Sequence, residues 1–161
     1  MLSQIKKSLQ VAWASPVTLV GLVYVSVLWA LGWYEWVGLR GDALVWHVRI
    51  ERCPTFLREK WKNWAGQTIG NVVVLKYDLS TERGNITLRH EQEHVHQCMV
   101  LGPFMPILYG LNYAMIWVTC RHSDAYYDSP FEIDARRAAG QVIDVVGLIE
   151  KLHAADQSAD K

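Results

Sequence analysis

The segment HEQEHVHQ, residues 90–97, leads directly into the apolar run MVLGPFMPILYG, residues 99–110. On a helix, His90 and His94 are one turn apart and project from the same face. Two imidazoles at this spacing can bind one zinc ion, and Glu91 is placed beside them without being a ligand. The segment therefore predicts a zinc-binding helix, and it raises the question of how such a helix joins an apolar run.

This spacing is the one that zinc peptidases use for hydrolysis. Zinc lowers the pKa of a bound water to about 7, and a neighbouring carboxylate can take its proton and pass it to a leaving amine. Glu91 is the candidate for this general base. The simpler alternative is a polar surface helix whose histidines align by chance, because short motifs also arise without function.

A catalytic zinc ion needs a third protein ligand and keeps one position open for water. The candidates downstream are His122, Asp124, Asp128, Glu132 and Asp134. Glu132 follows Ser129 and Pro130, which are typical of a helix start, and Ala135 on the same face would let another helix approach closely. Glu132 can equally complete a capping box with Ser129, and spacing alone leaves both roles open.

Residues 8–34 form another apolar region, which carries no charged side chain. A spanning helix needs about 20 apolar residues, and Trp13 and Trp33 lie roughly 30 Å apart along a helix, which is the thickness of the hydrocarbon core. Tryptophans at both ends are typical of the membrane interface. We predict an N-terminal membrane anchor over residues 1–38 and a domain over residues 39–161; a buried core helix and a cleavable signal peptide are the alternatives.

Net charge, the distribution of basic residues and the number of cysteines limit the partners and the location that we expect. The 161 residues have a formal net charge of zero, so nothing in the charge favours nucleic acid. More basic residues follow the first apolar region than precede it, and the three cysteines do not make an even disulfide framework; both features favour a cytoplasmic domain. We expect an inner-membrane protein, bacterial or phage-encoded, whose partners are the lipid membrane and a peptide or protein substrate.

The remaining patterns predict an α+β domain with a short sheet. Residues 43–50 and 72–77 are β-branched and aromatic enough for strands, and residues 54–64 have the pattern of an amphipathic helix. We expect Asn85 or Thr87 to cap the helix that carries the histidines. A final helix is expected to begin at the Ser-Pro-Phe-Glu motif and to continue to residue 153.

The second apolar run, residues 94–120, has no Asp, Glu, Lys or Arg. If it crossed a bilayer, His94 and Glu132 would emerge on opposite faces, roughly 30 Å apart, and no ion would join them. Gly102-Pro103 and Pro106 interrupt the run, and proline removes backbone hydrogen bonds that lipid cannot replace. We therefore expect a helical hairpin, or a helix lying at the interface, that returns the chain to the same side.

Four motifs, taken in order, carry a resemblance to a known family. They are the strand Gly70–Leu75, the HExxHxxQ helix ending at Gln97, the break Gly102-Pro103 and the motif Ser129–Glu132 with Ala135. This order resembles a family of uncharacterised bacterial membrane-associated proteins with a GHVVL-type strand, HExxHxxQ, a GP-containing apolar segment and NPFExxA. The resemblance covers residues 70–140. Asn71 stands where the family usually has histidine, and Ser129 where it usually has asparagine.

The resemblance implies a compact gluzincin-like zinc site, in which His90, His94 and Glu132 hold the ion and Glu91 is the general base. We expect a membrane-anchored zinc metallopeptidase with a zincin-like domain. The alternatives are a zinc-binding scaffold without activity and a small membrane protein without a metal. We also expect Gln97 to support the site and Val72–Leu75 to be the edge strand that a substrate pairs with. Candidates for stabilising the oxyanion are Tyr126, Tyr127 and His122.

Overall fold

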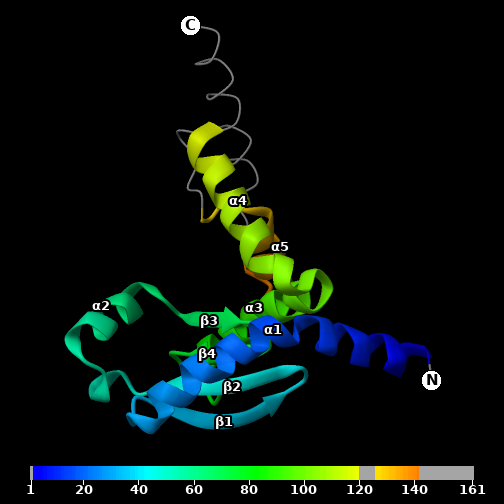
Figure 1. Ribbon diagram of the computed structural model, residues 1–161. Helices are drawn as coiled ribbons and strands as arrows, with labels where there is room; N and C mark the ends of the chain where they lie inside the picture. The colour runs from blue at the N-terminus through cyan, green and yellow to red at the C-terminus, as the bar shows by residue number, and fades with distance from the viewer. Residues whose placement is uncertain (1, 120–125, 142–161) are drawn as a thin grey trace, which may run out of the picture.

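The computed structural model describes residues 2–119 and 126–141 and has an α+β fold with a four-stranded mixed sheet (Figure 1). The elements in chain order are α1 (Leu2–Ala30), β1 (Tyr34–Arg40), β2 (Ala43–Val48), the 3-10 turn η1 (Ile50–Arg52), α2 (Thr55–Asn63), β3 (Gly66–Ile69), β4 (Val72–Leu75), α3 (Glu82–Leu101), the 3-10 turn η2 (Gly102–Phe104), α4 (Met105–Thr119) and α5 (Pro130–Ala138). The strands predicted over residues 43–50 and 72–77 and the helix over residues 54–64 are confirmed, with shorter bounds.

The strand order is β1-β2-β4-β3, with β2 and β4 parallel and the two outer pairs antiparallel. The expectation that Val72–Leu75 forms an edge is wrong, because this strand is covered on both sides by β2 and β3. Its composition explains the inner position: the sequence VVVL is buried along its whole length, as in strands covered on both faces. The edge next to the histidine helix is β3.

Alternate side chains of the inner strands build two cores. Val72 and Val74 pack with Val25 of α1 and with Trp61 of α2 on one face of the sheet. The side chains that alternate with them pack with α3 on the other face, in a cluster made of Ala14, Ala43, Val45, Val73, Leu75, Leu88, Val95 and Met99. The sheet therefore lies between two layers, with α2 and the part of α1 around Val25 on one side and α3 on the other, where Ala14 of α1 joins the cluster.

Helix α1 is long and apolar enough to cross a membrane, as the sequence predicts. It also packs along the sheet through polar contacts. Thr18 Oγ1 lies 3.0 Å from Asn71 Oδ1, and the hydroxyl of Tyr24 donates to Gln67 Oε1 at 3.1 Å. The boundary expected at residue 38, between anchor and domain, falls inside β1.

Helix α3 begins at Glu82 and is capped by Thr81, whose hydroxyl oxygen accepts from the backbone N–H of Gly84 at 3.0 Å. The expected cap at Asn85 or Thr87 is wrong, because both residues lie inside the helix. Thr81 is the residue before the first helical turn and adopts the extended backbone that a cap needs.

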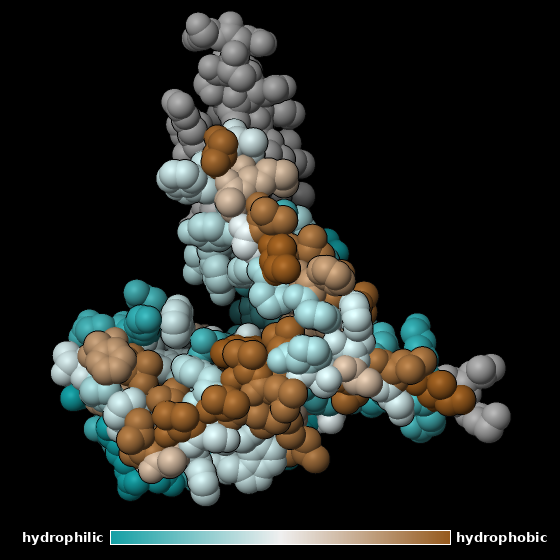
Figure 2. Space-filling model, in the orientation of Figure 1, coloured by the Kyte–Doolittle hydropathy of each residue, from teal (hydrophilic) through white to brown (hydrophobic). Residues whose placement is uncertain are grey.

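The second apolar run forms the end of α3, η2 and α4, and the three elements turn at Gly102, which has a positive φ of 57°. Helix α4 projects away from the sheet, and apolar side chains cover much of its surface (Figures 1 and 2). The helical segment Glu82–Thr119, which contains α3 and α4, is also long and apolar enough to cross a membrane. The chain between α4 and Tyr126, where the expected hairpin would turn, lies outside the described residues.

Helix α5 returns to the sheet domain and packs against α3, with Ala135 fully buried between them. The prediction that Ala135 permits a close helix approach is confirmed. The prediction of a continuous helix to residue 153 is wrong within the described residues, because α5 ends at Ala138 and Gly140 adopts a φ of 69°. Residues 142–153 lie outside the described residues.

Candidate metal centre

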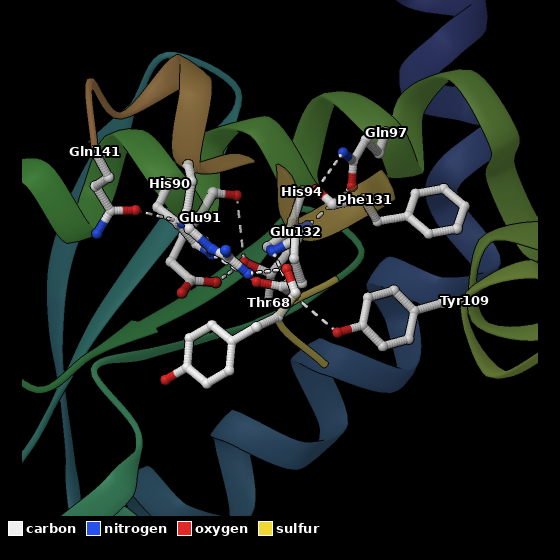
Figure 3. Close-up of polar contacts among 11 residues, drawn as sticks. Thr68, His90, Glu91, His94, Gln97, Tyr109, Phe131, Glu132 and Gln141 are labelled. Carbon is white, nitrogen blue, oxygen red and sulfur yellow. Dashed lines mark hydrogen bonds and ion pairs between the residues drawn. The ribbon is translucent and has the colours of Figure 1, made fainter. Parts of the chain in front are cut away.

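The structure brings His90, His94 and Glu132 together, although Glu132 is far from the histidines in sequence (Figure 3). The two oxygens of Glu132 divide between the two rings: Oε2 lies 3.3 Å from His90 Nε2, and Oε1 lies 3.2 Å from His94 Nε2. The histidines project from one face of α3, and Glu132 reaches them from the first turn of α5. These three residues can hold a metal ion.

The separations fit a small tetrahedral ion. An ion bound by nitrogen and oxygen ligands at about 2.0–2.1 Å in a tetrahedron has its ligand atoms about 3.3–3.4 Å apart. Each histidine nitrogen lies at about this distance from one Glu132 oxygen, 3.3 Å for His90 to Oε2 and 3.2 Å for His94 to Oε1, and the ligand atoms of the three residues all lie within 4.8 Å of one another. Two imidazoles and one carboxylate are also a ligand set that catalytic zinc uses.

Glutamine side chains hold both histidine rings from behind. The amide nitrogen of Gln97 donates to the backbone carbonyl of Phe131 at 3.0 Å, so its Oε1 is the atom that accepts from His94 Nδ1 at 2.9 Å. His94 then carries its proton on Nδ1 and presents the lone pair of Nε2 to the site. Gln141 Oε1 lies 3.1 Å from His90 Nδ1 and can act in the same way. The expected supporting contact of Gln97 is present, whereas Gln141 was not anticipated.

The carboxyl group of Glu132 is almost completely buried and does not form the capping box. Its side chain lies among the two histidines and Tyr109, whose hydroxyl donates to Oε1 at 2.9 Å. Ser129 is the N-cap residue of α5, but its hydroxyl has no hydrogen-bond partner among the described residues. Of the two roles that spacing leaves open for Glu132, the structure therefore has the one directed at the histidines.

Burial and charge act against each other on these ligands. Burial alone would raise the pKa of Glu132, but hydrogen bonds from His90 and His94 outweigh it and hold this pKa well below its usual range. Burial alone would lower the pKa of His94, but the hydrogen bond to Glu132 and the charge of Glu91 raise it to about 9. Without a metal, the raised pKa of His94 and the lowered pKa of Glu132 favour an ion pair between the two groups at neutral pH.

Glu91 lies on α3 beside the two rings and is buried against β3. Its Oε2 accepts from the hydroxyl of Thr68 at 2.7 Å, and its side chain packs on Gly66, where an added Cβ would come within 2.7 Å of the Glu91 Cδ. Burial raises the pKa of Glu91, while the neighbouring histidines oppose this shift. A carboxyl group with a raised pKa beside a metal site can accept and return a proton near neutral pH.

A pocket of about 480 Å³ opens beside these residues. Its floor contains Glu91, His94 and Glu132, and β3 forms one wall. The other walls are mainly apolar and come from α1 and from the start of α4; they include Val17, Met105, Pro106 and Tyr109. The arrangement leaves room for an extended ligand between the edge strand and the two apolar helices.

The tyrosines that sequence reasoning considered are only partly at this site. Tyr126 lines the pocket together with Glu91 and Glu132, and burial raises its pKa. Tyr127 lines a second pocket, which also contains His90, Glu91 and Glu132, and His122 lies outside the described residues. Tyr109, which contacts Glu132 directly, was missed; a hydroxyl inside an otherwise apolar run was the signal available for it.

The other candidate ligands are not part of the cluster. Asp134 is exposed and pairs with Arg137 at 3.0 Å, and Asp128 is not in the group of ligand atoms around the two histidines. His122 and Asp124 lie outside the described residues. Comparisons of the chain with known protein families, with characterised proteins and with solved structures find no match. Functional inference therefore rests on the geometry of this site.

Proposed function

We propose that the chain is a membrane-bound zinc metallopeptidase with a gluzincin-like site, as the HExxHxxQ and NPFExxA-type motifs suggest. The observation that carries the proposal is the convergence of the His90, His94 and Glu132 ligand atoms, which all lie within 4.8 Å of one another, with the buried carboxyl of Glu91 beside them. A purely structural zinc site has four protein ligands, whereas the part of the chain that the structure describes offers three. The open position is what a hydrolytic site requires.

When bound, zinc would supply a Lewis acid that lowers the pKa of the attacking water and polarises the substrate carbonyl. His90, His94 and Glu132 would hold the ion, and Gln97 keeps His94 in the tautomer that a metal needs. Glu91 would accept the proton of the water and return it to the leaving amine. Thr68 fixes its carboxyl group, and burial raises the pKa of that group, which favours uptake of a proton.

A peptide substrate fits the edge of β3. The N–H of Lys76 donates to the carbonyl of Ala65, so the alternation of the antiparallel ladder turns the backbone groups of Gly66 and Thr68 away from β4. These groups face the open edge beside Glu91. An extended peptide can pair with them as an added strand, which would place its backbone next to the metal ligands.

The test is the variant Glu91→Gln in the purified full-length chain. Zinc content is measured by elemental analysis, and hydrolysis is followed by mass spectrometry on a mixture of unstructured peptides. We expect the variant to retain zinc and to lose hydrolysis by at least about a hundredfold, as removal of a general base does. The companion variant Glu132→Ala is expected to lose zinc and hydrolysis together.

The same experiment separates the enzyme from a zinc-binding scaffold. A scaffold would bind about one zinc per chain and show no peptide hydrolysis that depends on Glu91. A chain that binds no zinc when purified with excess metal would contradict both possibilities, because sites of this kind bind with on the order of 10 kcal/mol.

A further inference from the structure

After Lys7, the face of α1 that points away from the sheet is mainly apolar. Its large exposed side chains are Trp13, Leu19, Val20, Val23 and Val27. No charged residue occurs between Lys7 and Glu35. The indole of Trp13 on this surface is 45% exposed, and that of Trp29, near the C-terminal end of the helix, is 59% exposed, although tryptophan is usually well buried.

The opposite face of α1 belongs to the protein core. Ala14 and Val25 are completely buried against the sheet, and Gly21 lies so close to β4 that an added Cβ would come within 3.0 Å of the Val72 side chain. Tyr24 makes hydrogen-bonding contacts with Tyr34 and Gln67 at 3.0 and 3.1 Å. A helix that crosses lipid alone would not pack against a sheet. Because α1 does so, the sheet must lie next to α1 in any position that α1 takes relative to a membrane.

This packing conflicts with a position across a bilayer. The hairpin of β1 and β2 lies beside α1, and ion pairs mark its two ends: Lys7 with Asp42 at 2.9 Å and Arg49 with Glu35 at 2.6 Å. Strand β1 is also an edge strand, with one side of its backbone unpaired by any strand of the sheet. If α1 crossed the membrane, this edge would enter the hydrocarbon, where unpaired backbone groups are not tolerated.

Helix α4, which runs crosswise to α1 (Figure 1), also has an apolar surface. The exposed apolar residues of α4 are Ile107, Leu108, Leu111, Tyr113, Met115, Trp117 and Val118. In Figure 2, side chains of both helices form hydrophobic areas on the same view of the molecule. Exposed apolar surfaces of this extent mark binding sites, and a lipid surface can receive two crosswise helices at once.

We infer that α1 does not cross the membrane but lies along its surface, with its outward face in the boundary between headgroups and acyl chains. The inference rests on the membrane-bound part of the proposed function and is independent of zinc and of hydrolysis. It places the N-terminus and the metal centre on the same side of the bilayer. It also places the pocket, whose walls include Val17 of α1 and Pro106 of α4, next to the lipid surface.

The topology is tested by labelling cysteines from one side of the membrane. Ser8→Cys marks the N-terminal end of α1, and Ser80→Cys marks the loop before α3; both side chains are exposed. A membrane-impermeant maleimide is added to intact spheroplasts and to inside-out vesicles, with the unaltered chain giving the background from its native cysteines. We expect both positions to react in the same preparation. Reaction of the two positions from opposite sides would overturn the inference.

The contact with lipid is tested by vesicle flotation of the purified chain on phosphatidylcholine with one-fifth phosphatidylglycerol. Val23→Glu changes the outward face of α1, and Ser80→Glu adds the same charge on a loop away from it; Val23 is 66% exposed, so folding does not depend on it. We expect Val23→Glu to reduce the bound fraction at least about tenfold and Ser80→Glu to leave it unchanged. Equal flotation of both variants, or self-association of the unaltered chain in place of flotation, would overturn the inference.

Discussion

At the scale of single residues, Gln97 makes the contact that prepares the site for a metal. It joins the Nδ1 of His94 to the backbone of α5 at Phe131, and so fixes both the ring orientation and its tautomer. We expect Gln97→Ala to weaken zinc binding about 10- to 100-fold, as the loss of a group behind a ligand histidine does. Competition with a zinc-chelating dye measures the affinity.

The matched control for Gln97→Ala is Gln92→Ala on the same helix. Gln92 faces away from the metal centre and donates to the backbone carbonyl of Arg40. The variant Gln92→Ala is expected to leave the zinc affinity within about twofold of that of the unaltered chain, because the hydrogen bond of Gln92 is to Arg40 and not to any of the three ligands. Equal losses in both variants would mean that Gln97 acts only on the stability of α3.

The pair of histidines was predictable from sequence because helical geometry alone places residues four apart on one face. The choice of Glu132 was not settled by spacing, since its alternative partner Ser129 is local whereas the histidines are far along the chain. Tyr109 and Gln141 were not found for the same reason: each reaches the site through the packing of α4 or of the segment after α5. A local pattern therefore shows which side chains share a helix face, whereas the tertiary fold decides which distant residues contact that face.

At the scale of elements, the approach of β3 to α3 sets the position of Glu91. Gly66 has no side chain, and a Cβ at this position would overlap the Glu91 carboxyl group, with its Cδ only 2.7 Å away. We expect Gly66→Ala to displace this group and to lower peptide hydrolysis at least about tenfold, because proton transfer needs hydrogen-bonding distance. Zinc content should stay unchanged, since Gly66 contacts none of the ligands.

The control for Gly66→Ala is Gly110→Ala on α4, where nothing lies within 4 Å of an added Cβ. It should change neither hydrolysis nor zinc content. If Gly66→Ala also proved silent, the carboxyl of Glu91 would have another position from which to act, and the close packing of β3 on α3 would not be needed for catalysis.

The sequence predicted the inner strands better than the outer ones. Strands β2 and β4 consist of β-branched and other apolar residues and were anticipated, whereas β1 and β3 were not. Strand β3 has the sequence GQTI and is only partly buried, so it lacks the alternation that identifies a strand. Its pairing is decided by the turn at Gly70 and by the packing of Thr68 on α3, neither of which a local pattern can show.

The junction of α3 and α4 depends on Gly102, which combines a φ of 57° with close packing on the indole of Trp13. Gly102→Ala is expected to destabilise the fold by more than the roughly 1–3 kcal/mol that a sparsely populated backbone conformation alone costs, because Gly102 has a φ of 57° and a ψ of −134°. Gly140→Ala is the matched control, because Gly140 also has a positive φ, of 69°, but nothing within 4 Å of an added Cβ. Thermal unfolding in detergent measures both, and equal shifts would show that the contact with Trp13 is not restrictive.

At the scale of the whole molecule, the candidate metal site joins helix α5 to the sheet domain. Helix α5 contacts α3 through Ala135, through the Gln97 bond to Phe131 and through Glu132 between the histidines. Two of these three contacts involve the site. Docking of α5 and binding of a cation are therefore coupled, and a ligand that binds only the docked state stabilises it by mass action.

This coupling predicts opposite pH behaviour with and without zinc. In the metal-free chain, the cation facing Glu132 is the His94 proton, and the pKa of His94 is raised to about 9 from an ordinary 6.5. A raised folded-state pKa gives stability that is complete below about pH 6.5 and is lost as the pH rises through about 9. We expect amide exchange in α5, corrected for the intrinsic rate and measured by mass spectrometry, to increase over this range after chelation, while exchange in β2 stays constant.

With zinc bound, the ion takes the place of the proton, and the affinity of the site for zinc rises with pH because binding no longer competes with protonation of the ligands. Slower exchange of α5 at pH 9 with zinc than without it is therefore the expected result, and α5 protection that is independent of both zinc and pH would show that packing on Ala135 alone holds the helix in place.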